Sequence, residues 1–185
     1  MNKQTAGALV ALIILPVNLM AATSNQPPES LTVLMDAINQ RLEIANEVAL
    51  SKWHSGKPVQ DSDRERQVIA NAALQAGEHR LSREDIRHFF AAQIEAGKMV
   101  QYARLAQWHA TGTAPAEPAQ GLAKNLRGQL DASQPELLKS YAAFFRYRKD
   151  VACPTWVMTV SERTTTDPIM KTALTRAVGE LCITG

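Results

Sequence analysis

The chain has 185 residues, of which 45% are hydrophobic, and its formal net charge is +2. A charge so close to neutral argues against a general nucleic-acid binder, and we interpret the local basic cluster of Arg146, Arg148 and Lys149 as a solvated helix end. The four histidines and two cysteines lack the spacing of metal ligands, so the sequence predicts no metal site.

Residues 1–22 have the features of a signal peptide. Lys3 precedes an apolar stretch over 6–20, and Ala21 and Ala22 are small residues suited to cleavage. The stretch is short for a membrane span and contains Pro16, although an uncleaved anchor is the alternative. We therefore expect a mature domain over 23–185 that is periplasmic or secreted and has no membrane contact after cleavage.

Export would place the two cysteines in an oxidising compartment. Cys153 and Cys182 are then expected to form one disulfide, and two free thiols are the less favoured alternative. The bond would close a loop of about 30 residues and stabilise the fold by roughly 3–4 kcal/mol on the chain-entropy model.

The periodicity and the turn residues predict helices along the whole mature chain. The expected helices are 30–54, 62–77, 82–110, 122–149, one that opens at Pro154, and one after Thr166-Asp167-Pro168. Ser62 and Glu65 have the spacing of a capping box at the start of the second helix. In the fourth helix, Ser133 and Glu136 have the same spacing, and Pro135 is expected to disturb the helix. Residues 111–121 form a linker between a first half over 30–110 and a C-terminal half over 122–185. The fold class is all-α, a single six-helix domain with one shared core.

Two cations lie on the apolar stripe of the first predicted helix. The stripe has spacings of three and four residues and consists of Leu31, Leu34, Ile38, Arg41, Ala45, Val48 and Lys52. A buried, unpaired cation costs several kcal/mol or more, so Arg41 and Lys52 need an anionic partner, either a protein carboxylate or a ligand. The pattern indicates an anion-binding pocket inside a helical bundle.

The stripe of the third predicted helix contains a polar residue as well. It consists of Phe90, Ile94, Gly97, Gln101, Leu105 and Trp108. The amide of Gln101 must find partners if it is buried, and Gly97 leaves space for a ligand beside it. A structural Gln101 bonded to a neighbouring helix is the alternative.

A charged segment, Asp61 to Arg66, opens the second predicted helix. A solvated first turn is the ordinary interpretation, because acidic residues complement the helix dipole there. If the first two helices are antiparallel neighbours, Arg64 or Glu65 instead faces the interior that contains Lys52.

These residues, in this order, resemble the all-helical chorismate mutases, and most closely the secreted branch of that family. The similarity is carried by Arg-Leu-Glu-Ile-Ala (41–45), Lys52, Pro-Val-Gln-Asp-Ser-Asp-Arg-Glu-Arg (58–66) and Gln-Ile-Glu-Ala…Gln (93–101). It implies a helical bundle of the chorismate mutase type II kind and an isomerase that converts chorismate to prephenate, the chemistry of aromatic amino-acid biosynthesis. The reaction is unimolecular and needs no cofactor. The resemblance also suggests a homodimer in which each chain holds a complete site.

The resemblance assigns roles residue by residue. Lys52 and Gln101 would donate to the ether oxygen of chorismate, where negative charge develops in the transition state. The remaining substrate contacts would come from Arg41 and Lys52 at the carboxylates, Arg64 at the anionic side, and Glu65 and the backbone near Asp61 at the ring hydroxyl. A further arginine from the C-terminal half would be Arg127, with Lys124 as the competitor.

One position departs from the family pattern. Gly97 stands where a Ser or Thr is common, which removes a hydroxyl that could bind a carboxylate. A non-enzymatic domain that binds a small dicarboxylate would use the same cations, and a structural protein would instead pair them with Glu43, Glu47 or Glu95.

Overall fold

The computed structural model describes residues 26–116 and 125–183, and all regular secondary structure in these ranges is helical. The elements are α1 (Glu29–Ser55), α2 (Ser62–Leu74), the 3₁₀ helix η1 (Ala76–His79), α3 (Arg83–Thr111), α4 (Leu126–Phe145), α5 (Cys153–Thr164) and α6 (Pro168–Val178). The predicted all-α fold with six α-helices is thereby confirmed for the described part of the chain. The predicted signal peptide, residues 117–121 of the predicted linker, and Lys124 in the C-terminal half lie outside the described residues.

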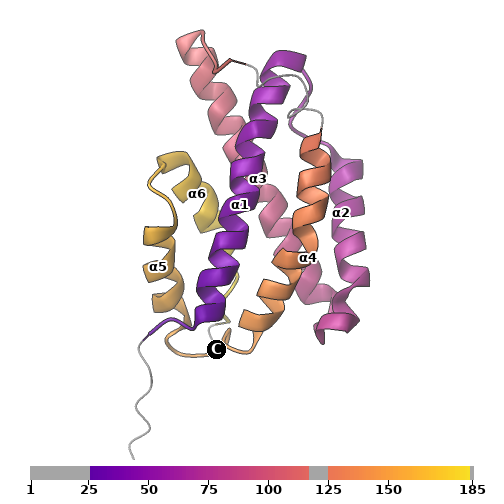
Figure 1. Cartoon of the computed structure of the whole chain (residues 1–185), viewed down its shortest axis with the longest axis vertical. Helices are drawn as coiled ribbons and strands as arrows, with labels where there is room; N and C mark the ends of the chain where they lie inside the picture. Colours follow the sequence, from indigo (N-terminus) through magenta and orange to yellow (C-terminus); the bar gives the residue numbers. More distant parts are fainter. Residues whose placement is uncertain (1–25, 117–124, 184–185) are drawn as a thin grey trace, which may run out of the picture.

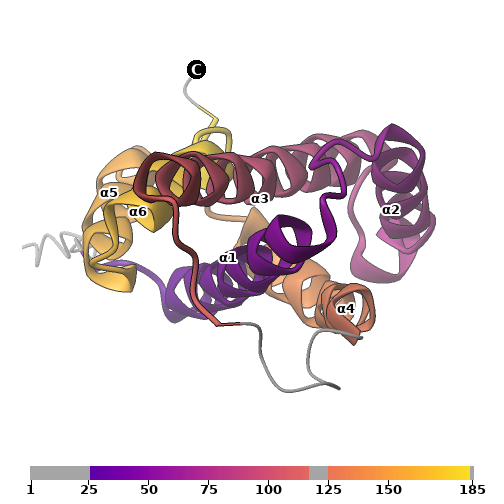
Figure 2. The same cartoon turned by 90° about the horizontal axis from the view of Figure 1, so that it is seen from above.

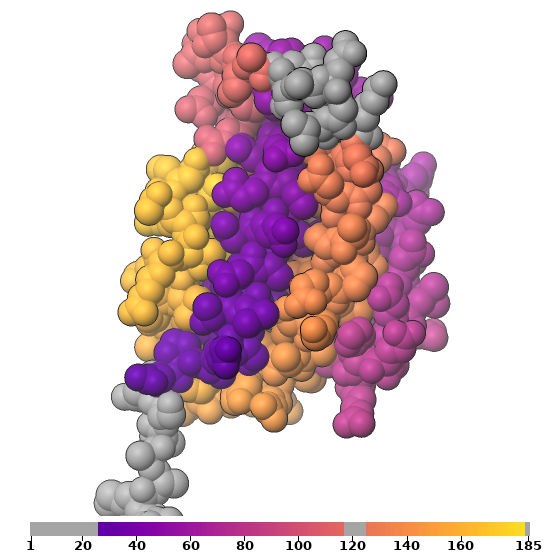
Figure 3. Space-filling model, viewed as in Figure 1, coloured from indigo at the N-terminus to yellow at the C-terminus, as the bar shows by residue number. Residues whose placement is uncertain are grey.

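The helices are arranged around α1, which packs against α3 on one side and α4 on another (Figure 1). Seen from above, α3 forms one layer while α1 and α4 form the other (Figure 2). The helix α2 covers one end of α3, and α6 packs on its opposite part beside α5. In the space-filling view α1 is visible along the front between α4 and the α5–α6 pair (Figure 3). We expected the first two helices to be neighbours, and this expectation was wrong, because α2 packs on α3.

The ends of the long helices follow from local chemistry. The side chain of Ser82 accepts a hydrogen bond from the backbone N–H of Asp85 and caps α3. Gly56 ends α1 with φ of 67° and Gly112 ends α3 with φ of 70°. Both values lie in the left-handed region that favours glycine, so these two residues stop the helices that carry most of the site.

Two predicted capping boxes were wrong, although α2 begins at Ser62 as expected. Asp61, and not Ser62, is the N-cap of α2, and its carboxylate accepts a hydrogen bond from the N–H of Arg64. The predicted start at Ser133 lies inside α4, which is continuous through Pro135. The hydroxyl of Ser133 does not cap a helix: it donates to the carbonyl of Leu130 in the preceding turn of α4 and accepts from Arg41.

One apolar core joins all the helices. It contains Leu34, Ile38, Phe90, Leu138 and Leu174, all at most 1% exposed, and so spans both sides of the linker. No helix in the described ranges is long and apolar enough to cross a membrane.

The short segment after α6 is fixed to the bundle in two ways. The predicted disulfide between Cys153 and Cys182 is confirmed. Arg148, expected at a solvated helix end, is in fact 9% exposed and donates to the carbonyls of Leu181 and Glu180 and to the carboxylate of Asp85. Arg148 is buried because its planar guanidinium satisfies these backbone carbonyls, which a local charge pattern does not reveal.

Candidate active site

A cavity of about 170 Å³ lies between α1, α2, α3 and the start of α4. All seven site residues predicted from the sequence contribute to its lining, namely Arg41, Lys52, Asp61, Arg64, Glu65, Gln101 and Arg127. The apolar part of the lining includes Ala45, Val48, Val59 and Ile94. The stripe of α1 therefore begins in the core at Leu31 and ends at the cavity with Lys52.

The two cations of α1 are held by neutral oxygen atoms. The Nη1 of Arg41 donates to the carbonyl of Leu130 at 3.0 Å and to the Oγ of Ser133 at 2.9 Å. The Nζ of Lys52 donates to the carbonyl of Val59 at 2.9 Å. A guanidinium has five N–H donors and an ammonium three, so both groups keep further donors.

Burial changes the acidity of both cations. It lowers the pKa of Arg41 to about 10, against the opposing effect of Asp131, and Arg41 remains charged at neutral pH. Burial also lowers the pKa of Lys52, and nearby Arg127 acts in the same direction, whereas Asp61 and Glu65 raise it. Neither cation forms an ion pair with Glu43, Glu47 or Glu95 among the described residues, which removes the support for a purely structural pairing.

Gln101 faces the same cavity from α3 and is 8% exposed. Its Nε2 donates to the carbonyl of Gly97 at 3.1 Å, within its own helix. Its Oε1 is buried and has no hydrogen-bond partner in the described structure. The alternative, in which the Gln101 side chain is hydrogen-bonded to a neighbouring helix, does not occur in the described structure. A Cβ added at Gly97 would meet only the Cβ of Ala45, at an ordinary 3.6 Å, so the glycine leaves room beside the amide.

The start of α2 forms a compact polar corner of the cavity. Glu65 accepts hydrogen bonds from the Nε2 of Gln60 at 3.0 Å and from the backbone N–H of Asp61 at 3.3 Å. Arg64 and Glu65 both line the cavity together with Lys52, although α2 itself packs on α3. The segment 56–61 thus brings the charges of α2 to the end of α1.

Two ion pairs connect α2 with α4 across the cavity. Arg64 pairs with Asp131, and Arg127 pairs with Asp61 at 3.0 Å. The side chain of Arg127 is 76% exposed and lies at the mouth, whereas that of Arg64 is 28% exposed. These carboxylates occupy guanidinium groups that an anionic ligand could also bind.

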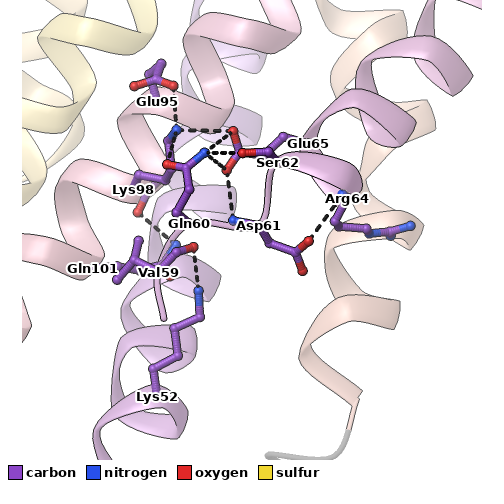
Figure 4. Close-up of polar contacts among 11 residues, drawn as sticks. Lys52, Val59, Gln60, Asp61, Ser62, Arg64, Glu65, Glu95, Lys98 and Gln101 are labelled. Atoms are coloured by element: carbon purple, nitrogen blue, oxygen red, sulfur yellow. Dashed lines mark hydrogen bonds and ion pairs between the residues drawn. The ribbon is translucent and has the colours of Figure 1, made fainter. Parts of the chain in front are cut away.

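The sequence analysis missed Lys98. Figure 4 shows its ammonium beside the carboxylates of Glu65 and Glu95 and the amide of Gln60. Burial lowers its pKa, but hydrogen bonds to Glu95 and Glu65 raise it by more, so the pKa lies above its ordinary value. The sequence could have indicated Lys98, because Ile94, Lys98 and Gln101 have the spacing of one helix face. A lysine three residues after Glu95 is, however, equally typical of an exposed ion pair on a helix surface.

The lining of the cavity carries more positive than negative charges. Five cationic side chains line the cavity, at positions 41, 52, 64, 98 and 127, and three carboxylates, at positions 61, 65 and 131. The balance, five minus three, is a net charge of +2. Asp131, which sequence reasoning also missed, lies one helical turn after Arg127 on the same face of α4. The arrangement suits a small ligand with two negative charges.

Comparisons with known proteins give one consistent result. Residues 32–102 match the family model described as chorismate mutase type II. The secreted chorismate mutase of Mycolicibacterium smegmatis is 42% identical over 78 residues, which are 42% of this chain and 43% of that protein. The match thus spans less than half the length of this curated relative.

Solved structures cover much more of the chain. A chorismate mutase from Burkholderia phymatum has 39% sequence identity and a TM-score of 0.77, over 84% of this chain and 98% of the other. A chorismate mutase from Burkholderia thailandensis has 32% identity and a TM-score of 0.77, over 84% and 100%. The likeness therefore extends well past α3 into the C-terminal helices.

Proposed function

The chain belongs to the chorismate mutase type II family, and on that premise we propose that it rearranges chorismate to prephenate in the cavity between α1, α2, α3 and α4. One observation carries the proposal: the lining has a net charge of +2, and chorismate is a dicarboxylate. The reaction needs a compact substrate conformer and donors directed at the ether oxygen as the C–O bond breaks.

Lys52 and Gln101 are the proposed donors to that oxygen. The carbonyl of Val59 fixes the ammonium of Lys52 and leaves two of its three N–H groups free to donate. The carbonyl of Gly97 accepts one N–H of the Gln101 amide, and the second N–H stays free to donate to the substrate. Donors held in this way need little reorganisation when negative charge develops, and the surrounding apolar walls strengthen the interaction.

The remaining charged groups would hold the substrate. Arg41, Arg64 and Arg127 are the proposed partners of the two carboxylates, and Asp131 and Asp61 would give up part of their contacts to make room. Glu65 is the proposed acceptor for the ring hydroxyl, supported by its position beside the N–H of Asp61. None of these roles requires a metal or a cofactor, because the rearrangement is unimolecular.

We also propose that the mature protein is exported, over residues 23–185, and acts in the periplasm or outside the cell. The relatives named secreted chorismate mutase, the signal-like residues 1–22 and the Cys153–Cys182 bond support this location. Assembly as a homodimer remains a proposal from the family resemblance.

The competing function is a non-enzymatic domain that captures a small dicarboxylate. It would use the arginines equally, but it has no need for Lys52 and Gln101 to approach one ether oxygen. Mixing the purified protein with chorismate and following its ultraviolet absorbance distinguishes the two. A protein that binds chorismate without converting it would support the competing function.

Lys52→Met tests the assigned role of the ammonium. We expect kcat/KM to fall by at least ~10²-fold, the usual value of a preorganised donor to a developing oxyanion. Met keeps the unbranched apolar part of the side chain and removes the ammonium with its charge and donors. Lys57→Met, at an exposed position of the loop after α1, is the matched control and should keep wild-type activity. A folded Lys52→Met variant with near-normal kcat/KM would show that the cation is structural.

A further inference from the structure

Lys98 is the cavity cation with the most side-chain partners. Its Nζ lies 3.1 Å from Glu65 Oε2, 2.7 Å from Glu95 Oε1 and 3.2 Å from Gln60 Oε1. Its side chain is only 12% exposed, compared with 48% for that of Glu95. A lysine rarely gives up its solvation to this degree unless it is paired, and its partner Glu65 is also largely buried, with a side chain 20% exposed.

We infer that Lys98 is a positioning residue: it holds the carboxylate of Glu65 in the orientation that accepts a hydrogen bond from the ring hydroxyl of the substrate. The inference rests on the proposed function and adds to it a residue that the family resemblance did not assign. Glu65 belongs to α2 and Lys98 to α3, so the contact also fixes the start of α2 relative to the helix that carries Gln101 (Figure 4).

Lys98 limits the rotational freedom of the Glu65 side chain. Without Lys98, its carboxylate would be held by the amide of Gln60 and the N–H of Asp61, and Gln60 would itself lose the Lys98 contact to its Oε1. Lys98 offers Glu65 a full positive charge, whereas Gln60 and Asp61 offer only neutral N–H donors, so the ammonium is the strongest restraint on the carboxylate. The donors at Lys52 and Gln101 do not contact Lys98, which leaves the charge-stabilising step intact.

Kinetics separate this role from the alternatives. A hydroxyl contact is made equally in the bound substrate and in the transition state, so its loss raises KM and leaves kcat nearly unchanged. We expect Lys98→Met to raise KM about tenfold with kcat within about twofold of wild type, the size of one lost charge-assisted hydrogen bond. Lys98→Arg should restore KM to within about threefold, because it returns a cationic donor to Glu65.

The decisive measurement is the same substitution in a Glu65→Gln background. Gln keeps an acceptor oxygen for the hydroxyl but offers no charge to the ammonium, so Lys98→Met should then change KM by less than about twofold. An equal tenfold rise in both backgrounds would mean that Lys98 binds the substrate directly, and it would overturn the inference. Unchanged KM in the single variant, with or without a lower melting temperature, would overturn it too.

Controls keep the result interpretable. Lys139→Met removes an exposed lysine that pairs with Glu136 on α4 and should leave both constants unchanged. If Lys98→Met does not fold, Lys98→Gln supplies a neutral donor of similar size, and the same dependence on Glu65 is expected. Wild-type protein that does not convert chorismate would overturn the proposed function together with this inference, whereas active wild type and an unaffected Lys98→Met variant would overturn the inference alone.

Discussion

Gln101 has a buried amide oxygen without a hydrogen-bond partner among the described residues, which a purely structural glutamine would not leave unsatisfied. It is buried on the helix face that lines the cavity, and the carbonyl of Gly97 fixes its amide within α3. An amide does not titrate, so it can donate to the ether oxygen at any ordinary pH. A glutamate at the same position would donate only when protonated, which makes the residue a sensitive test of the site.

Gln101→Glu should have low activity at neutral pH and recover as the pH falls. An ionised carboxylate there would repel the developing negative charge, and protonation restores a donor. Burial favours the neutral form and nearby Lys52 favours the charged form, so the direction of recovery is the prediction. The measurement is kcat/KM against pH, with Gln101→Leu as a control that stays poor at every pH. A profile parallel to wild type would mean that residue 101 does not face the reacting oxygen.

The sequence identified those site residues that are polar but lie at positions where the helix pattern predicts an apolar side chain. Arg41, Lys52 and Gln101 occupy apolar stripe positions, so a polar interior could be inferred without coordinates. Lys98 and Asp131 each have an ordinary explanation as exposed charges on a helix. Their contacts with Glu65 and Arg64 depend on how α2, α3 and α4 meet, which no local pattern contains.

At the scale of the elements, Asp167 connects three helices. Its carboxylate caps α6 by accepting from the N–H groups of Ile169 and Met170, and it pairs with Arg104 of α3. Arg104 in turn donates to Asn46 of α1 at 2.7 Å. Burial raises the pKa of Asp167, but the Arg104 and backbone contacts lower it by more, so the pKa lies below its ordinary value of 3.8.

Asp167→Asn should therefore remove a part of the stability that depends on pH. A carboxylate whose pKa is lower in the folded state contributes stability above its unfolded pKa, and that contribution is lost as the pH falls through the folded value. Asn keeps a capping oxygen, so the expected loss at pH 7 is only about 0.5–1 kcal/mol for the partly exposed pair. Urea unfolding at pH 7 and pH 3 measures it. A difference between wild type and variant that does not shrink at pH 3 would contradict the argument.

The start of a helix could be predicted from the sequence where several local signals indicate the same residue. The sequence Thr166-Asp167-Pro168 correctly indicated the start of α6, because an N-cap and an early proline agree there. The capping boxes predicted at Ser62 and Ser133 were wrong. Asp61 caps α2 in place of Ser62, and the hydroxyl of Ser133 accepts a hydrogen bond from Arg41 inside α4. Proline at position 135 does not break α4, which packs along α1.

At the scale of the molecule, the disulfide and the cavity occupy separate regions. Cys153 and Cys182 join the start of α5 to the chain after α6, and neither lines the candidate active site. Stability and catalysis should therefore respond differently to its removal.

The double variant Cys153→Ala, Cys182→Ala should lower the free energy of unfolding by about 3–4 kcal/mol on the chain-entropy model for a loop of this length. We expect kcat/KM at 25 °C to remain within about twofold of wild type, because the cavity residues keep their contacts. Chemical denaturation and the chorismate assay on the same sample provide both values. A variant that stays folded but loses most of its activity would show that the C-terminal helices control the site.

The seven site residues predicted from the sequence meet at one cavity of the same chain, from α1 through the first turns of α4. A site that borrows a residue from a neighbouring subunit loses activity on dilution, as the subunits separate. Here each chain should instead keep its full turnover from micromolar to low nanomolar protein, whatever the affinity of the proposed dimer. Activity per chain measured across that range, beside the molecular mass in solution, would show whether a lone molecule is a complete catalyst.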